Sequence, residues 1–149
     1  MGIKLKTSNH EIALHLERSQ ERMIDQIIMN LQYVGEACIT EARDRGSYQD
    51  QTGNLRSSIG YVIVKDGQIV SKGLNKEAKA KDGRDRASSF LDELAAKSES
   101  GKITLIVVAG MNYAAYVERS GYNVLTSAEL LAEQLVPQLM KQLGFDVMR

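Results

Sequence analysis

The sequence of 149 residues has little cysteine, proline and histidine, and it has no tryptophan. Its single cysteine, Cys38, excludes an internal disulfide. Because Cys38 lies in an apolar helical pattern, we expect it to be buried as a small hydrophobic side chain rather than to act as a reactive thiol. The two histidines, His10 and His15, do not have the i,i+3 or i,i+4 spacing that places two ligands on one helical face. We therefore predict neither a metal site nor a bound cofactor.

A net charge is also absent, because 19 basic residues balance 19 acidic ones. The whole chain therefore has no bias toward nucleic acid or membranes. No run approaches the roughly 20 apolar residues of a membrane-spanning helix, and the N-terminal residues lack the apolar stretch of a signal peptide. What is present, 43% hydrophobic and 26% charged residues, predicts one soluble domain over residues 1–149. The single thiol fits a reducing cytoplasm.

The first part of the chain has the pattern of one long amphipathic helix. Ser8 and Glu11 form a capping box at its start, and Gly46 marks its end. We expect its apolar stripe to face the core, with a break near residues 19–20 as an alternative. The stripe recurs at three- and four-residue steps and consists of Ile12, Leu16, Met23, Ile27, Leu31, Val34, Cys38 and Ala42. Before the helix, residues 3–6 read Ile-Lys-Leu-Lys, an alternation typical of a short edge strand or a loose tail.

Two apolar runs at residues 59–64 and 69–74 flank an Asp-Gly pair, which predicts a hairpin with a tight type I′ turn. This turn predicts the facing pairs Val64–Ile69, Ile63–Val70, Tyr61–Lys72, Gly60–Gly73 and Ile59–Leu74. The face that we expect in the core is formed by Ile59, Tyr61, Ile63, Val70 and Leu74. Residues 103–108 are apolar on both sides, which predicts the central strand of the sheet.

Between these strands lies a charged segment, residues 75–101, which we predict to be a mobile excursion. It includes a short helix with an apolar side formed by Phe90, Leu91, Leu94 and Ala95. Further helical patterns cover residues 113–118 and run from residues 126–127 to Gly144, where Pro137 predicts a kink. The fold class is therefore α+β. We expect a long N-terminal amphipathic helix and a C-terminal helix packed on a small antiparallel sheet of three or four strands.

Catalytic patterns are weak, and we expect that the protein is not an enzyme. Gly101-Lys102 lacks the first glycine and the Ser or Thr of a phosphate-binding loop, and no serine lies in a G-x-S-x-G turn. A small enzyme whose carboxylates are assembled only by the fold stays open as an alternative. Residues 72–86 hold six basic and three acidic residues, so a nucleic-acid-binding module is a second alternative. That segment has no aromatic side chain to stack on bases.

Two segments combine residue types that are enriched at protein interfaces. Residues 52–57 join a glycine turn, an apolar residue and an arginine just before a strand. Residues 113–121 place Tyr113 and Tyr116 three apart, where they can present one aromatic face. The alternative for both is a plain loop and a packed short helix. The predicted partner contacts are Thr52, Gly53, Asn54, Leu55, Arg56, Ser57, Tyr113, Tyr116, Glu118 and Gly121.

At these two segments the sequence resembles the minor neck and tail-completion proteins of long-tailed bacteriophages. In that family a long amphipathic helix runs into a Thr-Gly-x-Leu-Arg-x-Ser-Ile segment, which here is residues 52–59. A later Tyr-Ala-x-Tyr-Val-Glu segment corresponds to residues 113–118. The resemblance covers most of the chain. It departs from the family at residues 49–51, where Pro-Val-Asp is usual, and at residues 123–125, where Pro-Phe-Leu is frequent.

The resemblance implies a non-enzymatic structural protein at the head–tail junction or tail end of a phage or prophage particle. Copies would form a ring, in which each copy meets the next through two different surfaces. Other neck and tail proteins would be the remaining partners, with no membrane contact and with DNA contact unsupported by the pattern. The protein would be located in the virion, and in the cytoplasm of the bacterial host during assembly. The contact surfaces would be residues 52–58, residues 113–121 and the charged segment.

Overall fold

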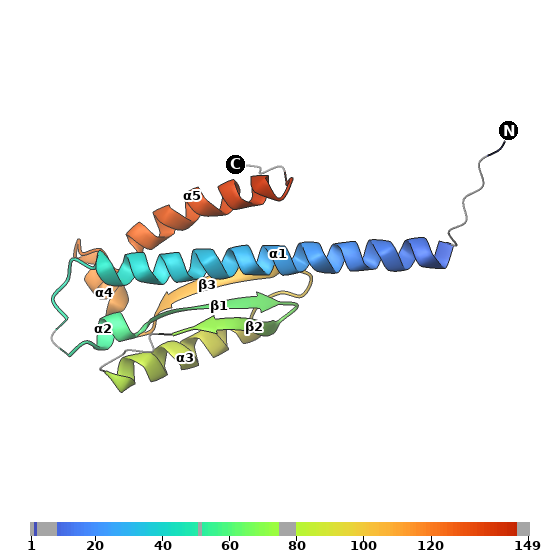
Figure 1. Ribbon diagram of the computed structural model, residues 1–149. Helices are drawn as coiled ribbons and strands as arrows, with labels where there is room; N and C mark the ends of the chain where they lie inside the picture. The colour runs from blue at the N-terminus through green and yellow to red at the C-terminus, as the bar shows by residue number, and fades with distance from the viewer. Residues whose placement is uncertain (1, 3–8, 51, 75–79, 146–149) are drawn as a thin grey trace.

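The structure is a computed structural model that describes residues 2, 9–50, 52–74 and 80–145. One long helix covers one face of a three-stranded antiparallel sheet, a second helix covers the other face, and the last helix lies against the first (Figure 1). In chain order the elements are α1 (Asn9–Asp44), α2 (Asn54–Ser57), β1 (Ile59–Lys65), β2 (Gln68–Gly73), α3 (Lys81–Ala96), β3 (Ile103–Ala109), α4 (Ala114–Arg119) and α5 (Thr126–Gln142). The predicted α+β class and the small antiparallel sheet are confirmed.

Helix α1 is continuous over 36 residues, so the predicted break near residues 19–20 does not occur. Its C-terminal half packs on the sheet, where the predicted stripe is buried at Leu31, Val34 and Cys38. Its N-terminal half extends past the end of the sheet (Figure 1). The core prediction is wrong there, because Ile12, Leu16 and Met23 are 42%, 58% and 38% exposed. Ser8 of the predicted capping box and residues 3–6 lie outside the described residues.

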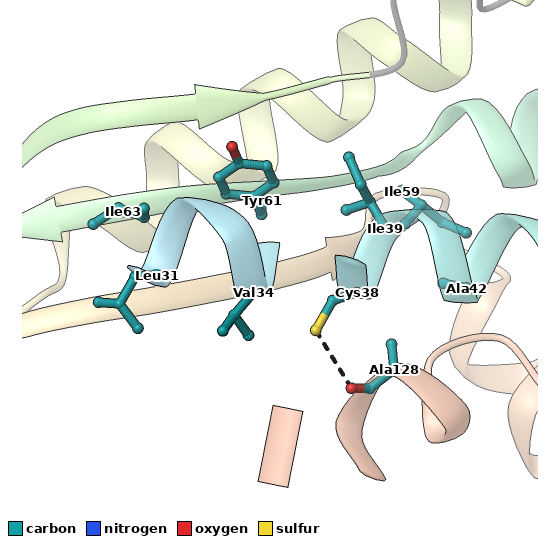
Figure 2. Packing of buried hydrophobic residues seen from close by; sticks show 9 residues of the cluster. All are labelled: Leu31, Val34, Cys38, Ile39, Ala42, Ile59, Tyr61, Ile63 and Ala128. Atoms are coloured by element: carbon teal, nitrogen blue, oxygen red, sulfur yellow. Dashed lines mark hydrogen bonds between the residues drawn. The ribbon is translucent and has the colours of Figure 1, made fainter. Parts of the chain in front are cut away.

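The main core lies between α1, β1 and α5 (Figure 2). Cys38 is buried there, and its thiol donates a weak hydrogen bond to the backbone oxygen of Ala128 at 3.5 Å. Burial, together with the charge of Glu41, raises the pKa of this thiol. A thiol that keeps its proton is a poor nucleophile, so the structure confirms Cys38 as a buried hydrophobic residue.

The hairpin has the predicted turn, because Asp66 and Gly67 both have positive φ angles, 52° and 77°. Val64 faces Ile69 as predicted. Beyond that pair the register shifts, and the observed partners are Ile63–Ser71, Val62–Lys72 and Tyr61–Gly73. The other predicted pairs are therefore wrong. Val70 is the extra residue of a β-bulge, which leaves it 44% exposed and removes it from the predicted core face. Leu74 packs on the opposite face, with Val62 and Leu91.

The strand order is β2-β1-β3, so β1 is the central strand and the prediction that residues 103–108 form the centre is wrong. Ile59, Tyr61 and Ile63 face α1, whereas Val62 and Val64 face α3. β3 pairs with β1 alone among the described residues. Its apolar side chains on both faces are only half-buried, apart from Val108.

Instead of a mobile excursion, residues 81–96 form helix α3, which packs on the second face of the sheet. The predicted short helix captured only its second half. The helix buries four residues at four-residue steps, namely Gly83, Ala87, Leu91 and Ala95. Gly83 and Ala87, in the first half of the helix, are too small to give a clear apolar signal in the sequence. Phe90, predicted on the buried side, is 38% exposed, and residues 75–79 of the excursion lie outside the described part of the chain.

The helices α4 and α5 lie where the sequence pattern predicts helices, and the kink predicted at Pro137 stays a prediction. Gly121 and Gly144 follow α4 and α5, and both have a φ of 92°, a left-handed conformation that glycine adopts readily at helix ends. α5 continues through Pro137 to Gln142. In the part of the chain that the structure describes, no helix is long and apolar enough to cross a membrane.

Candidate partner interface

The first predicted contact segment is a tightly bonded corner between α1 and β1. Gly53 has a φ of 75°, which turns the chain into the single-turn helix α2. The carboxylate of Asp50 accepts hydrogen bonds from the amides of Leu55 at 3.4 Å and Arg56 at 2.9 Å. The hydroxyl of Thr52 accepts one from the amide of Asn54 at 3.3 Å. These side chains satisfy amide groups at the start of α2 that have no partner within the helix.

Arg56 fastens this corner to the end of α1. Its guanidinium donates to the backbone oxygens of Arg43 at 3.2 Å and Gly46 at 3.1 Å. The last carbonyls of a helix lack partners within the helix, so the arginine completes α1. The same group lies 4.9 Å from the centre of the Tyr48 ring, a cation–π arrangement. Burial raises the pKa of Tyr48 to about 12 despite the nearby positive charge, so its hydroxyl stays protonated at neutral pH.

Most side chains of this segment therefore make contacts within the domain. Leu55 and Ser57 are 2% and 4% exposed. The side-chain oxygen of Asn54 accepts a hydrogen bond from the amide of Gly83 at 3.3 Å, which ties the corner to the first turn of α3. Of the six predicted residues in this segment, only Thr52 is exposed, and the others are buried or half-buried. A glycine, a leucine and an arginine before a strand are equally suited to a structural corner, and the sequence does not separate the two roles.

The second predicted segment is more exposed, and it lies beside the first. Tyr113 and Tyr116 are 38% and 69% exposed, at the start and in the middle of α4. The side chains of Tyr113 and Thr52 lie close enough for Thr52 to affect the pKa of the Tyr113 hydroxyl. Beneath them, Leu55 belongs to a small cluster whose other members are Tyr48, Met111, Ala114 and Val124. The two segments, about 60 residues apart in sequence, thus meet at one end of the molecule, where α2 and α4 lie (Figure 1).

Glu118, which we predicted as a partner contact, caps the start of α5. Its carboxylate accepts hydrogen bonds from the amides of Leu125 at 3.3 Å and Thr126 at 3.0 Å, and also from the amide of Val124 and the hydroxyl of Thr126. A carboxylate at a helix N-terminus satisfies free amides and interacts favourably with the helix dipole. Partial burial raises the pKa of Glu118, but these hydrogen bonds outweigh it and hold the pKa below its ordinary value. Gly121, in the following turn, is exposed.

The cap predicts a pH-dependent effect of replacing Glu118 by glutamine, which has a similar shape but no charge. Because the folded-state pKa is lowered, the stability from the charged form is complete above the unfolded pKa of about 4.3 and is lost as the pH falls through the folded value. At pH 7 we expect E118Q to lose about 1 kcal/mol of unfolding free energy, the usual cost of a weakened cap. The difference from the wild type should shrink below about pH 4. Urea unfolding at several pH values measures it, and a difference that does not change with pH contradicts the cap.

The projecting half of α1 is a second candidate surface, which the sequence pattern placed wrongly in the core. We call residues 9–26 the α1 arm; every residue in it is exposed except Ile24, which is half-buried. Ile12, Leu16 and Met23 lie along one side of the arm, at helical spacing. Arg18 lies on the opposite side. The signal that distinguishes the arm from the rest of α1 is weak, because both carry the same apolar period.

The basic segment at residues 72–86 is partly neutralised within the fold. The Lys72 ammonium lies 2.6 Å from the carboxylate of Asp92, and it also donates to the hydroxyl of Ser88 at 2.8 Å. Arg86 pairs with Asp82 at 3.3 Å on the exposed side of α3. Within the described ranges, no three of the His, Cys, Asp and Glu side chains come together in a way that could hold a metal ion.

Comparisons with protein-family models, curated proteins and solved structures produced no match to this chain. The resemblance to phage neck and tail-completion proteins is therefore carried by residues 52–59 and 113–118 alone, and it stays a prediction.

Proposed function

We propose that the protein is a structural component of a phage or prophage particle, at the head–tail junction or tail end. In this role it joins copies of itself and neighbouring neck or tail proteins into a ring. The resemblance at residues 52–59 and 113–118 supports the phage setting. One structural observation carries the assembly role, namely the α1 arm with its exposed apolar side.

The exposed apolar side of the α1 arm can gain free energy by packing against another copy. Burying apolar surface contributes roughly 25 cal/mol per Å², and Ile12, Leu16 and Met23 leave that gain unused in a single copy. A helical segment of this length gains little stability in water from backbone bonds alone, and it becomes firm when its apolar side packs on another surface. Exposed apolar stripes of this kind mark sites of protein contact. A projecting arm also suits a ring, because it gives each copy one surface for the next copy and leaves a different one for the previous copy.

The two alternative functions receive no comparable support. The enzyme alternative needs converging reactive groups. Six acidic side chains of the described residues are instead held in ion pairs or cap helices, namely Glu41, Asp50, Asp82, Glu93, Glu99 and Glu118. The nucleic-acid alternative depends on basic residues at 72–86, of which Lys72 and Arg86 are paired with carboxylates.

A pair of charge substitutions on the arm tests the proposal. Leu16→Glu places a charge on the apolar side, whereas Arg18→Glu introduces the same residue on the opposite side as a control. Both positions are exposed, so both variants should fold with unfolding free energies within about 0.5 kcal/mol of the wild type. In a host whose own copy of the gene is deleted, L16E should lower the yield of complete tailed particles at least about tenfold, and R18E should support normal assembly.

The yield is counted by electron microscopy of particles purified after induction. Mass spectrometry of the same wild-type particles should detect the protein as a stoichiometric component. Particles that assemble normally with L16E, or that lack the protein altogether, would remove the proposal.

A further inference from the structure

The outer edge of β3 presents unpaired backbone groups in a regular alternation. The register pairs Val62 with Ile106 and Gly60 with Val108, and the amide of Gly110 bonds to the oxygen of Ser58 at 2.9 Å. In an antiparallel pair, every second residue directs both its N–H and its C=O toward the partner. The even-numbered residues of β3 therefore bond to β1. The odd-numbered ones, Ile103, Leu105, Val107 and Ala109, direct these groups outward, where no other described strand lies.

This edge lacks the features by which proteins usually block strand addition. Edge strands that are protected against strand addition carry charged residues, prolines or bulges. β2, the opposite edge, has a bulge and contains Gln68, Ser71 and Lys72. β3 reads Ile-Thr-Leu-Ile-Val-Val-Ala over seven residues, with no charge, no proline and no bulge in its pairing with β1. The contrast between the two edges indicates that the outer edge of β3 can accept an added strand.

Hollows flank the open edge on both sides. One of about 360 Å³ runs along it and is lined by Phe90 and Leu94 of α3, Ile106 and Val108 of β3, and Ala115 and Leu125. A second, of about 260 Å³, lies under α5 and is lined by Cys38, Val107, Leu125, Ala128, Glu129 and Ala132. Toward the end of β3, the α3 side carries the carboxylates of Asp82, Asp85 and Glu93 against the single guanidinium of Arg86. An extended segment with apolar residues on one face and basic residues on the other fits this edge.

We propose that the outer edge of β3 accepts residues 3–6 of a second copy of this chain as an added strand. These residues read Ile-Lys-Leu-Lys. In an extended conformation their side chains alternate, so Ile3 and Leu5 enter the apolar hollow under α5. Lys4 and Lys6 lie on the α3 side, where their aliphatic stems cover the apolar hollow and their ammonium groups face the carboxylates of α3. The main-chain groups of Leu105 and Val107 supply the hydrogen bonds of strand addition.

The length of the α1 arm requires that the donor is another copy. The arm spans 18 residues, so Asn9 lies roughly 27 Å beyond the part of α1 that packs on the sheet. From Asn9, the three residues to position 6 reach back about 10 Å at most. The segment at 3–6 therefore cannot reach β3 of its own copy, and the α1 arm to which it is joined extends past the end of the sheet (Figure 1). The exchange is head-to-tail, and it deepens the proposed ring assembly, on which its biological setting rests.

The test uses a peptide of residues 2–10 and the chain beginning at residue 9, with amide exchange followed by NMR. Without peptide, Thr104, Ile106 and Val108 should exchange slowly, because their amides bond to β1, and Leu105 and Val107 should exchange faster. Peptide at about ten times its dissociation constant should slow exchange at Leu105 and Val107 about tenfold. Ile106 should change less.

Two protein variants and two peptide variants sharpen the result. Val107→Pro removes an outward amide without removing a bond to β1, so it should abolish the effect, whereas Val107→Ala keeps the amide and should retain it. In the peptide, replacing Ile3 and Leu5 by serine should abolish binding. Replacing Lys4 and Lys6 by glutamate should weaken it about tenfold at low salt. If V107P does not fold, the test is the pattern in the wild type: peptide should slow amide exchange at Leu105 and Val107 and change it less at Ile106, which lies between them.

Several outcomes overturn the proposal. The first is that millimolar peptide does not slow amide exchange at Leu105 and Val107. The second is that peptides of any sequence slow it equally. The third is that these two amides already exchange slowly in the chain that lacks residues 1–8. The last would show that β3 pairs with β3 of another copy. Peptide binding to isolated protein tests the strand addition, whereas the composition of purified particles tests the proposed function. Either proposal can therefore be contradicted without the other.

Discussion

Leu91→Ala is expected to lower the free energy of unfolding by about 2–5 kcal/mol, the usual cost of emptying a fully buried leucine site. Leu91 is fully buried between α3 and the sheet, where it contacts Val62 and Val64 of β1. The effect is large because the neighbouring strand backbone is held on both sides and cannot collapse into the cavity. Chemical denaturation followed by circular dichroism measures it, with the slope of unfolding free energy against denaturant compared between variants.

The matched control is Leu130→Ala, the same truncation on α5 at a side chain that is 62% exposed. It should cost less than about 1 kcal/mol. Equal losses of unfolding free energy at the two positions would mean that α3 does not pack on the sheet. The charge of residues 75–101 predicts that result, because it is typical of a mobile segment.

Gly83→Ala is the second large effect, and its expected sign is opposite to that of helix propensity. Alanine in place of glycine in a helix usually adds up to about 1 kcal/mol of stability. At this position a Cβ atom would collide with the backbone oxygen of Asn54 and come within 3.0 Å of the Ser57 Cβ. Neither neighbour can rotate away, because the corner that holds them is fixed to α1 by Arg56. We expect a loss of about 1–3 kcal/mol in unfolding free energy.

Ser89→Ala, at an exposed position of the same helix, should be neutral or slightly stabilising and separates helix propensity from the collision. Thermal unfolding of the three proteins under identical conditions gives the comparison. A Gly83→Ala variant that melts above the wild type would show that α3 and the corner at residues 52–57 are not in contact.

Local patterns were sufficient for most of the elements. The Asp-Gly pair identified the turn at Asp66 and Gly67, and the apolar period of residues 9–44 identified α1. The bulge at Val70 could not be predicted, because nothing in a run of apolar residues shows which one leaves the ladder. The prediction of the central strand was wrong because β1 and β3 are both apolar on two faces. Among the described strands, only β1 has a neighbour on each side. α3 was underestimated because it packs through Gly83 and Ala87, which carry no apolar signal.

The candidate surfaces show the same limit. Residue types identified the segments at 52–57 and 113–121, but they did not show that the two meet, or that Leu55 and Glu118 serve the fold. Whether an apolar stripe is covered depends on the position of the rest of the chain. For this reason Ile12 and Leu16 resembled core residues in the sequence and are exposed in the structure.

We propose that copies of this chain are joined in a phage or prophage particle through the α1 arm. Electron cryomicroscopy of the purified particle tests it most directly, at the head–tail junction and the tail end. The account predicts a ring of copies in which the arm of each one, with Ile12 and Leu16 against protein, lies on the next copy. A well-resolved junction and tail end with no density for this chain, or a ring whose arms all point into solvent, would contradict it.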